Sequence, residues 1–345
     1  MRLKLAAVIA LILVALLGVA GCTVNPSTTK EAPSIQLYSS WVMKSHVYEG
    51  SIHFHSTNSD GADTPEQMSA AYRAEGFNFT VLSDHHVVTS NYTPAPDILA
   101  ISGEEITTCE KGDNCSFLNQ VHTLAIGITH TIGTRSSSNV SQGNTQTVIN
   151  NIVNQGGLAA LAHPAFPGAI YTNPLGLQNY TFIETQNYTH PLINLTNAQA
   201  WQYYDTILSG GKQVWALRDD DAHEATSVNR SATMVNADRL TKADIMANLK
   251  AGNYYVAAGF GSTGMREMAR ISSITTNNDT ITVKVPQNST IQWIKSGGVI
   301  VKTTANVITD SYKAQGDEGY VRTVVSRSDN PEAQAWSQPI FVALA

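Results

Sequence analysis

Few residues of this chain carry a charge, and no segment is rich in lysine and arginine. Asp, Glu, Lys and Arg make up 14% of the 345 residues, and the formal net charge is −6. Without a basic stripe, binding to nucleic acid is not expected. The sequence also has no internal repeat and no low-complexity tract. With 42% hydrophobic residues, its length suits one large domain followed by a small one.

Cysteine is scarce as well, and the first of the three cysteines marks a processing site. Arg2 and Lys4 precede an uncharged apolar run over residues 5–17, and Val19-Ala20-Gly21-Cys22 follows. Small residues before a cysteine are typical of a lipoprotein signal peptide, here residues 1–22, with a lipid attached to Cys22 after cleavage. The alternative is an uncleaved transmembrane helix, for which the run is short of about 20 residues. We therefore expect an exported protein that is anchored to the outer face of the cell membrane and has a net charge of −8 once Arg2 and Lys4 are removed.

The other two cysteines lie close together in the segment CEKGDNC. Outside the cytoplasm, Cys109 and Cys115 at this spacing favour a small disulfide loop. Two free thiols or a weak metal clip are the alternatives.

The rest of the chain divides into three parts. Residues 23–47 are polar and indicate a tether that ends in a first packed segment near residues 40–42. Over residues 48–264, apolar runs alternate with helical patterns, which predicts βα units and a parallel sheet. Residues 265–345 lose the helical signals and predict a small antiparallel β domain. The expected strands of the first domain are 51–55, 79–82, 98–101, 121–128, 158–161, 181–183 and 213–217, its helices are 64–75, 145–155, 197–208 and 242–250, and the strands of the second are 280–285, 291–294, 299–301, 320–325 and 340–342.

Histidines and carboxylates gather where the predicted strands end. His53 and His55 form an H-x-H pair, and alternation along a strand places both side chains on one face. A single histidine is more often structural than a ligand, but this pattern recurs at consecutive strands. In a parallel barrel the carboxyl ends of the strands meet at one mouth. Imidazole and carboxylate together suit Zn, Mn or Fe. The candidate ligands are His53, His55, Asp60, His85, Glu105, His122, His163, Asp221 and His223.

The ordered motifs resemble those of the polymerase-and-histidinol-phosphatase (PHP) family. They are HFHSTNSDG, VLSDHH, SGEEIT, VHTLAIG, GGLAALAHP, FIETQN and DDDAH, over about residues 48–260. The downstream sequence, with YVRTVV at 320–325 and AWSQPIFV at 335–342, resembles the carbaryl-hydrolase-like (CehA/McbA) branch. The resemblance implies a distorted seven-stranded (β/α) TIM-like barrel followed by the β domain.

The resemblance also implies two or three divalent ions at the barrel mouth. One ion takes His53, His55, Glu105 and Asp221, a second takes Asp60, His85 and His223, and a third takes His122 and His163, with Glu105 bridging. Three consecutive aspartates precede His223, and Asp221 is chosen because the family motif has the spacing D-x-H. Of the two neighbouring glutamates, Glu105 is chosen because it matches the family spacing Gly-x-Glu. Glu184 and Asn187 match a family element near the pocket wall, in a structural role.

A site that holds such ions indicates a hydrolase. Water bound to the ions has a lowered pKa and supplies a hydroxide nucleophile, so that His53, His55, Glu105 and Asp221 act through the metal. Asp84 or His86 is expected to orient a ligating histidine. Arg218 is expected either to bind the substrate anion or to pair with Asp219 or Asp220.

The substrate is expected to be a small-molecule ester. A phosphoesterase is the first hypothesis. A metal-dependent carbamate or carboxylic ester hydrolase is the alternative, and a non-catalytic surface lipoprotein that binds metal or ligand is the second alternative.

Overall fold

The computed structural model describes residues 34–109, 120–133, 145–164, 173–187, 193–259 and 267–345, without the side chains of Cys109 and of residues 193–199. The signal peptide, the lipid on Cys22 and the disulfide partner Cys115 lie outside the described residues. Within the described ranges, no helix combines the length and the apolar character needed to cross a membrane.

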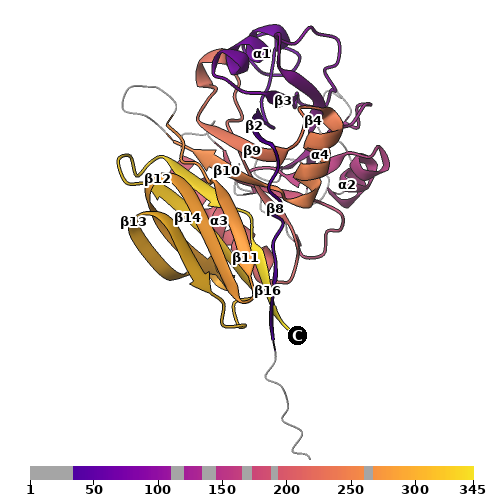
Figure 1. Cartoon of the computed structure of the whole chain (residues 1–345). Helices are drawn as coiled ribbons and strands as arrows, with labels where there is room; N and C mark the ends of the chain where they lie inside the picture. Colours follow the sequence, from indigo (N-terminus) through magenta and orange to yellow (C-terminus); the bar gives the residue numbers. More distant parts are fainter. Residues whose placement is uncertain (1–33, 110–119, 134–144, 165–172, 188–192, 260–266) are drawn as a thin grey trace, which may run out of the picture. The chain divides into compact units, whose positions relative to one another are not determined.

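One half of a mixed sheet carries the candidate ligands; Figure 1 labels four of its strands, β2, β3, β4 and β8. Its strands are β2 (His46–Ser51), β3 (Phe79–Leu82), β4 (Leu99–Cys109), β5 (Gln120–Ile126), β6 (Leu158–Leu161), β7 (Phe182–Asn187) and β8 (Trp215–Asp219), paired in this order. The pairs β2/β3, β3/β4, β6/β7 and β7/β8 are parallel, as expected. The prediction of an all-parallel sheet is wrong at β5, which runs antiparallel to both β4 and β6. The reason is that β4 extends eight residues further than the predicted end at residue 101, and β5 pairs with this extension in the opposite direction.

The strand path is open, so the expected closed TIM-like barrel is not confirmed. Among the described strands, β8 is the last of the path and pairs with β7 alone. Single contacts join this end to the chain after β2: Ile52 N–H donates to Asp219 Oδ1 at 2.7 Å, and Phe54 and Ala222 form an isolated parallel bridge. These contacts bring the segments after β2 and β8 together without a continuous ladder.

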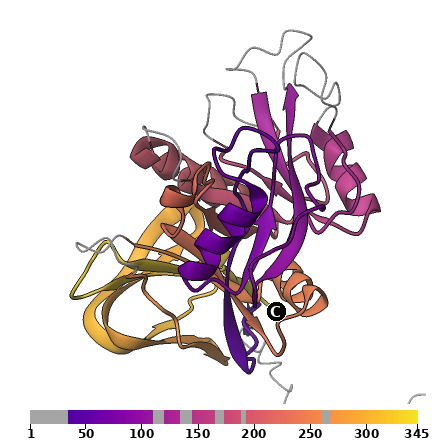
Figure 2. The same ribbon diagram turned by 90° about the horizontal axis from the view of Figure 1, so that it is seen from above.

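Four α-helices match the predicted ones in position: α1 (Pro65–Ala74), α2 (Thr145–Asn154), α3 (Ile193–Ser209) and α4 (Lys242–Ala251). Figure 2 shows them from above. The capping box predicted at the start of α1 is present, because Thr64 Oγ1 accepts from Gln67 N–H at 3.3 Å and Gln67 Oε1 accepts from Thr64 N–H at 2.8 Å. Two short 3₁₀ helices, η2 (Ala225–Ser227) and η3 (Ser296–Gly298), complete the described helices.

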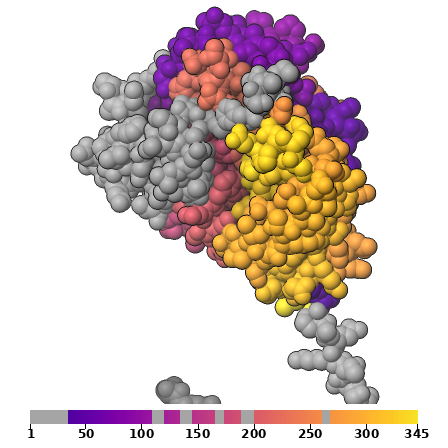
Figure 3. Space-filling model, turned by 90° about the vertical axis from the view of Figure 1, so that its left-hand side faces the viewer, coloured from indigo at the N-terminus to yellow at the C-terminus, as the bar shows by residue number. Residues whose placement is uncertain are grey.

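The C-terminal strands are antiparallel, as predicted. They are β11 (Ser273–Asn277), β12 (Thr280–Lys295), β13 (Val299–Lys313), β14 (Tyr320–Arg327), β15 (Gln334–Ser337) and β16 (Ile340–Leu344). In the space-filling view they form a continuous surface from orange to yellow (Figure 3).

The C-terminal strands also continue the sheet of the first half instead of standing apart. β10 (Tyr254–Ala258) pairs with β15 on one side and with β9 (Ser231–Ala237) on the other, and β9 pairs with β2. One hydrophobic core accordingly includes Phe54 and Tyr72 from the first half and Trp293 from β12.

The folded part begins earlier than the predicted boundary at residue 48. β1 (Ile35–Tyr38) pairs with β16, and Ser40 Oγ donates to Gly252 O at 2.7 Å. Ser34–Ala345 accordingly form one compact unit. The second half of the expected tether is therefore packed, because the last strand of the chain offers it an edge to pair with.

Candidate metal centre

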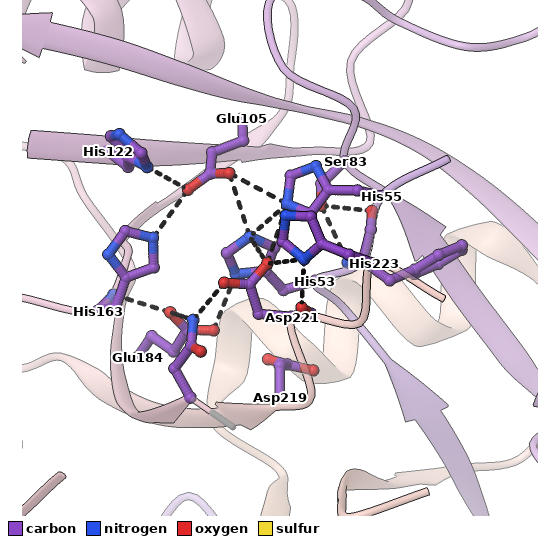
Figure 4. Close-up of polar contacts among 12 residues, drawn as sticks. His53, His55, Ser83, Glu105, His122, His163, Glu184, Asp219, Asp221 and His223 are labelled. Atoms are coloured by element: carbon purple, nitrogen blue, oxygen red, sulfur yellow. Dashed lines mark hydrogen bonds and ion pairs between the residues drawn. The ribbon is translucent and has the colours of Figure 1, made fainter. Parts of the chain in front are cut away.

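His53 and His55 follow β2 and point into the same space (Figure 4). Both side chains are fully buried, and their Nε2 atoms are 3.2 Å apart. Their backbone is fixed by the chain after β8, since His53 O accepts from Asp221 N–H at 3.1 Å and His55 N–H donates to Ala222 O at 2.9 Å. The H-x-H pair is thus held by the contacts that join the chain after β2 to the chain after β8.

Glu105 is the hub of the centre. The sequence predicted Glu105 just beyond the end of a strand, but it lies within β4. Its side chain is buried, with 1% exposed. One carboxylate oxygen, Oε1, lies 2.8 Å from His122 Nδ1 and 2.9 Å from His163 Nε2. The other, Oε2, lies 3.2 Å from the Nε2 of His55 and 3.3 Å from those of His53 and His85. A single carboxylate therefore contacts five histidines.

Asp221 closes the centre from the β8 side. Its Oδ1 atom lies 3.2 Å from His53 Nε2 and 3.0 Å from His55 Nε2. His223 and Asp60 lie further out, with His223 Nε2 3.4 Å from Asp60 Oδ2. Asp60 Oδ1 is also 3.5 Å from His55 Nδ1.

These atoms form four groups of three that could each hold an ion, with ligand atoms within 4.8 Å of one another. The groups are His53–His55–Asp221, His53–Glu105–His163, His55–Asp60–His223 and His55–His85–Glu105. Every predicted ligand except His122 belongs to at least one group, and His122 reaches the centre through Glu105.

The charges of the donor set fit divalent cations. Burial opposes a charge on His55, but hydrogen bonds to Asp221 and Glu105 outweigh it and raise the pKa of His55 to about 10. Burial likewise opposes a charge on His53, yet Asp221, Glu184 and Glu105 hold its pKa well above the usual value. Two imidazolium rings with Nε2 atoms 3.2 Å apart would repel each other. A metal ion would neutralise the same carboxylates and would take both rings as neutral ligands, so the residues fit the expected ions.

Asp84, expected to orient a ligating histidine, contacts a loop instead. Its buried carboxylate accepts from Ser56 N–H at 2.7 Å and from the hydroxyls of Ser56 and Ser59 at 2.8 Å and of Thr89 at 2.5 Å. Ser56 and Ser59 belong to the turn that leads from His55 to Asp60. Asp84 therefore holds the loop that carries Asp60.

Arg218 is buried on β8, with its guanidinium 3.4 Å above the ring of Trp336. Side chains alternate along a strand, so Arg218 and Asp219 face opposite sides of β8. Asp220 accepts three consecutive backbone N–H groups, from residues 229 to 231. This placement lends no support to the predicted contact of Arg218 with a substrate anion.

His86, the other residue expected to orient a ligating histidine, donates its backbone N–H to Glu105 O at 3.0 Å.

Comparisons with known proteins add little to this geometry. No protein-family model matches the chain, and no curated protein matches it in sequence. Among solved structures, a two-domain protein from Bacteroides vulgatus containing a predicted PHP-like metal-dependent phosphoesterase is 15% identical with a TM-score of 0.47, covering 88% of this chain and 97% of that one. A lesion-specific endonuclease from Pyrococcus furiosus is 15% identical with a TM-score of 0.42, covering 68% and 64%. An amidohydrolase from Chromobacterium violaceum is 16% identical with a TM-score of 0.37, covering 51% and 87%. The case for a function therefore rests on the geometry of the centre.

Proposed function

We propose that this protein is a hydrolase that depends on two or three divalent metal ions and acts as a phosphoesterase on a small-molecule ester. The observation that carries the proposal is the overlap of the candidate ion groups, which share Glu105, His53 and His55. When bound, ions at such a centre activate water as a nucleophile and neutralise charge that develops on the attacked group. Zn, Mn and Fe all suit this mixture of imidazole and carboxylate.

The exposure of the ligands indicates the side from which a substrate arrives. The side chains of His53 and His55 are 0% exposed, whereas those of Asp60, His223 and His85 are 52%, 30% and 23% exposed. The buried pair therefore holds ions at the bottom of the centre. The Asp60, His85 and His223 side is open to water and is where the ester would bind.

A carbamate or carboxylic ester hydrolase, as in the carbaryl-hydrolase-like branch, is the second candidate. The placement of Arg218 over Trp336 favours it, because the cation expected to bind a phosphate lies against a ring. A neutral ester needs no such cation, whereas a phosphate ester would have to be bound by the metal ions themselves.

The proposed location of the enzyme follows from the sequence alone. We propose that Cys22 carries the lipid that anchors the exported chain to the membrane. Labelling with a radioactive fatty acid tests this, and equal labelling of Cys22→Ala would disprove it.

The test of function combines metal content by plasma mass spectrometry with hydrolysis of matched aryl phosphate and aryl carboxylate esters. In the wild-type chain we expect two or three ions and hydrolysis of the aryl phosphate. His53→Ala and Asp221→Asn are expected to lose both the ions and the hydrolysis. His130→Ala is the matched control, because His130 is exposed and contacts Thr129 rather than the centre. Turnover of the carboxylate ester alone would select the second candidate. Phosphate hydrolysis unchanged in His53→Ala would refute both.

A further inference from the structure

β7 supplies none of the predicted ligands, yet two of its side chains contact three ligand residues. Glu184 is fully buried, and its Oε1 atom lies 2.9 Å from His53 Nδ1. Its Oε2 atom accepts the backbone N–H of His163 at 2.7 Å. Three residues further along β7, Asn187 Nδ2 donates to Asp221 Oδ2 at 2.7 Å. Figure 4 shows Glu184 on the side of His53 away from Glu105.

The first of these contacts sets the tautomer of His53. An ionised carboxylate only accepts hydrogen bonds, so His53 Nδ1 carries the proton that it donates to Glu184. In the neutral ring, Nε2 then presents its lone pair. That atom lies 3.3 Å from Glu105 Oε2 and 3.2 Å from Asp221 Oδ1, among the other candidate ligands.

The other two contacts involve residues whose backbone lies in a region that L-residues rarely adopt. His163 has φ 21° and Asp221 has φ 49°, in the left-handed region. Non-glycine residues persist in this strained region only where the surrounding structure holds them. Glu184 holds the backbone N–H of His163, and Asn187 holds the side chain of Asp221.

We propose that Glu184 is a positioning residue that couples two ligands, orienting His53 through its ring and His163 through its backbone. This inference rests on the proposed metal-dependent function and deepens it. Both oxygens of Glu184 are required, because each accepts from a different donor. His53 and His163 belong with Glu105 to one candidate ion group, so a single change at Glu184 disturbs two of its three ligands.

Glu184→Gln tests the proposal with little change of shape. An amide has one acceptor oxygen, so its NH₂ group must face either His53 Nδ1–H or His163 N–H, and one contact is lost. In titrations of the full chain with Zn²⁺ alone, we expect affinity at the tightest site to fall about 10- to 100-fold. Glu318→Gln is the matched control, since Glu318 is a buried carboxylate that accepts from Tyr312 and from two backbone N–H groups in the C-terminal strands.

A second measurement does not depend on Glu184→Gln. In the Zn²⁺-loaded chain labelled with ¹⁵N-histidine, the ring of His53 is expected to carry its proton on Nδ1, with His53→Gln used for assignment. A proton on Nε2 of His53 would overturn the proposal, as would wild-type Zn²⁺ affinity in Glu184→Gln. A wild-type chain that binds none of Zn²⁺, Mn²⁺ and Fe²⁺ would overturn the proposed function and this inference together.

Discussion

Replacing Glu105 with glutamine is the sharpest single perturbation of the candidate centre. Three histidine nitrogens lie 3.2 to 3.3 Å from Glu105 Oε2, and two lie 2.8 to 2.9 Å from Oε1. At an effective dielectric constant of about 20, a carboxylate attracts each unit of positive charge on an ion about 4 Å away by about 4 kcal/mol. The amide of glutamine keeps part of this attraction as a dipole. We therefore expect a loss of at least about 4 kcal/mol, which corresponds to roughly a thousandfold in kcat/KM.

The assay is kcat/KM for an aryl phosphate, measured with the metal content of the same preparation. Glu104→Gln is the matched control, because Glu104 is the neighbouring buried glutamate and its carboxylate accepts from Ile132 N–H at 2.8 Å and Gly133 N–H at 2.6 Å. It should lose stability but keep its ions. If Glu105→Gln keeps wild-type metal content and loses less than tenfold in activity, the argument that one carboxylate organises the ions is refuted.

Three further predictions concern stability. Removal of the ions with a chelator should lower the melting temperature by on the order of 5 °C, since ligand at 100 times its Kd stabilises by about 2.7 kcal/mol; identical melting with and without chelator would contradict a bound ion. Asp205→Ala should lower the free energy of urea unfolding by about 3–5 kcal/mol, because Asp205 pairs with the buried Arg322 at 2.8 Å. Adding Arg322→Met should restore part of the loss, since no unpaired charge then stays buried. Equal stability of the single and double variants would argue against this. Burial tends to raise the pKa of Asp310, but hydrogen bonds from Lys302 and Trp293 outweigh it and lower that pKa. Its contribution is therefore present above the unfolded pKa of about 4 and lost as the pH falls through the folded pKa, so unfolding curves of Asp310→Asn and wild type should converge between pH 6 and acid pH.

The sequence predicted most of the local structure around the centre, because each signal was local. The H-x-H spacing alone places His53 and His55 on one side of the chain, and Thr64 and Gln67 alone specify the start of α1. The four α-helices were predicted for the same reason. Glu184 was expected to be structural, and a glutamate directly after two apolar residues in FIETQN was the local sign of its contacts with His53 and His163.

Strand direction and sheet closure could not be predicted in this way. Whether β8 closes on β2 depends on contacts between residues far apart in the chain, such as Ile52 with Asp219. The early start of the fold has the same origin, since β1 pairs with β16 at the other end of the sequence. Register between distant strands is set by packing and not by local propensity.

The antiparallel course of β5 explains how His122 reaches the centre. In a parallel strand, a residue near the start lies at the end of the sheet opposite the carboxyl ends. His122 is the third residue of β5, and the centre is formed by residues near the carboxyl ends of β2 and β8. Reversal of β5 places its beginning beside the second half of β4, where His122 pairs with Thr107, two residues from Glu105. The departure from a parallel sheet is therefore what lets a residue at the start of a strand contact the carboxylate hub.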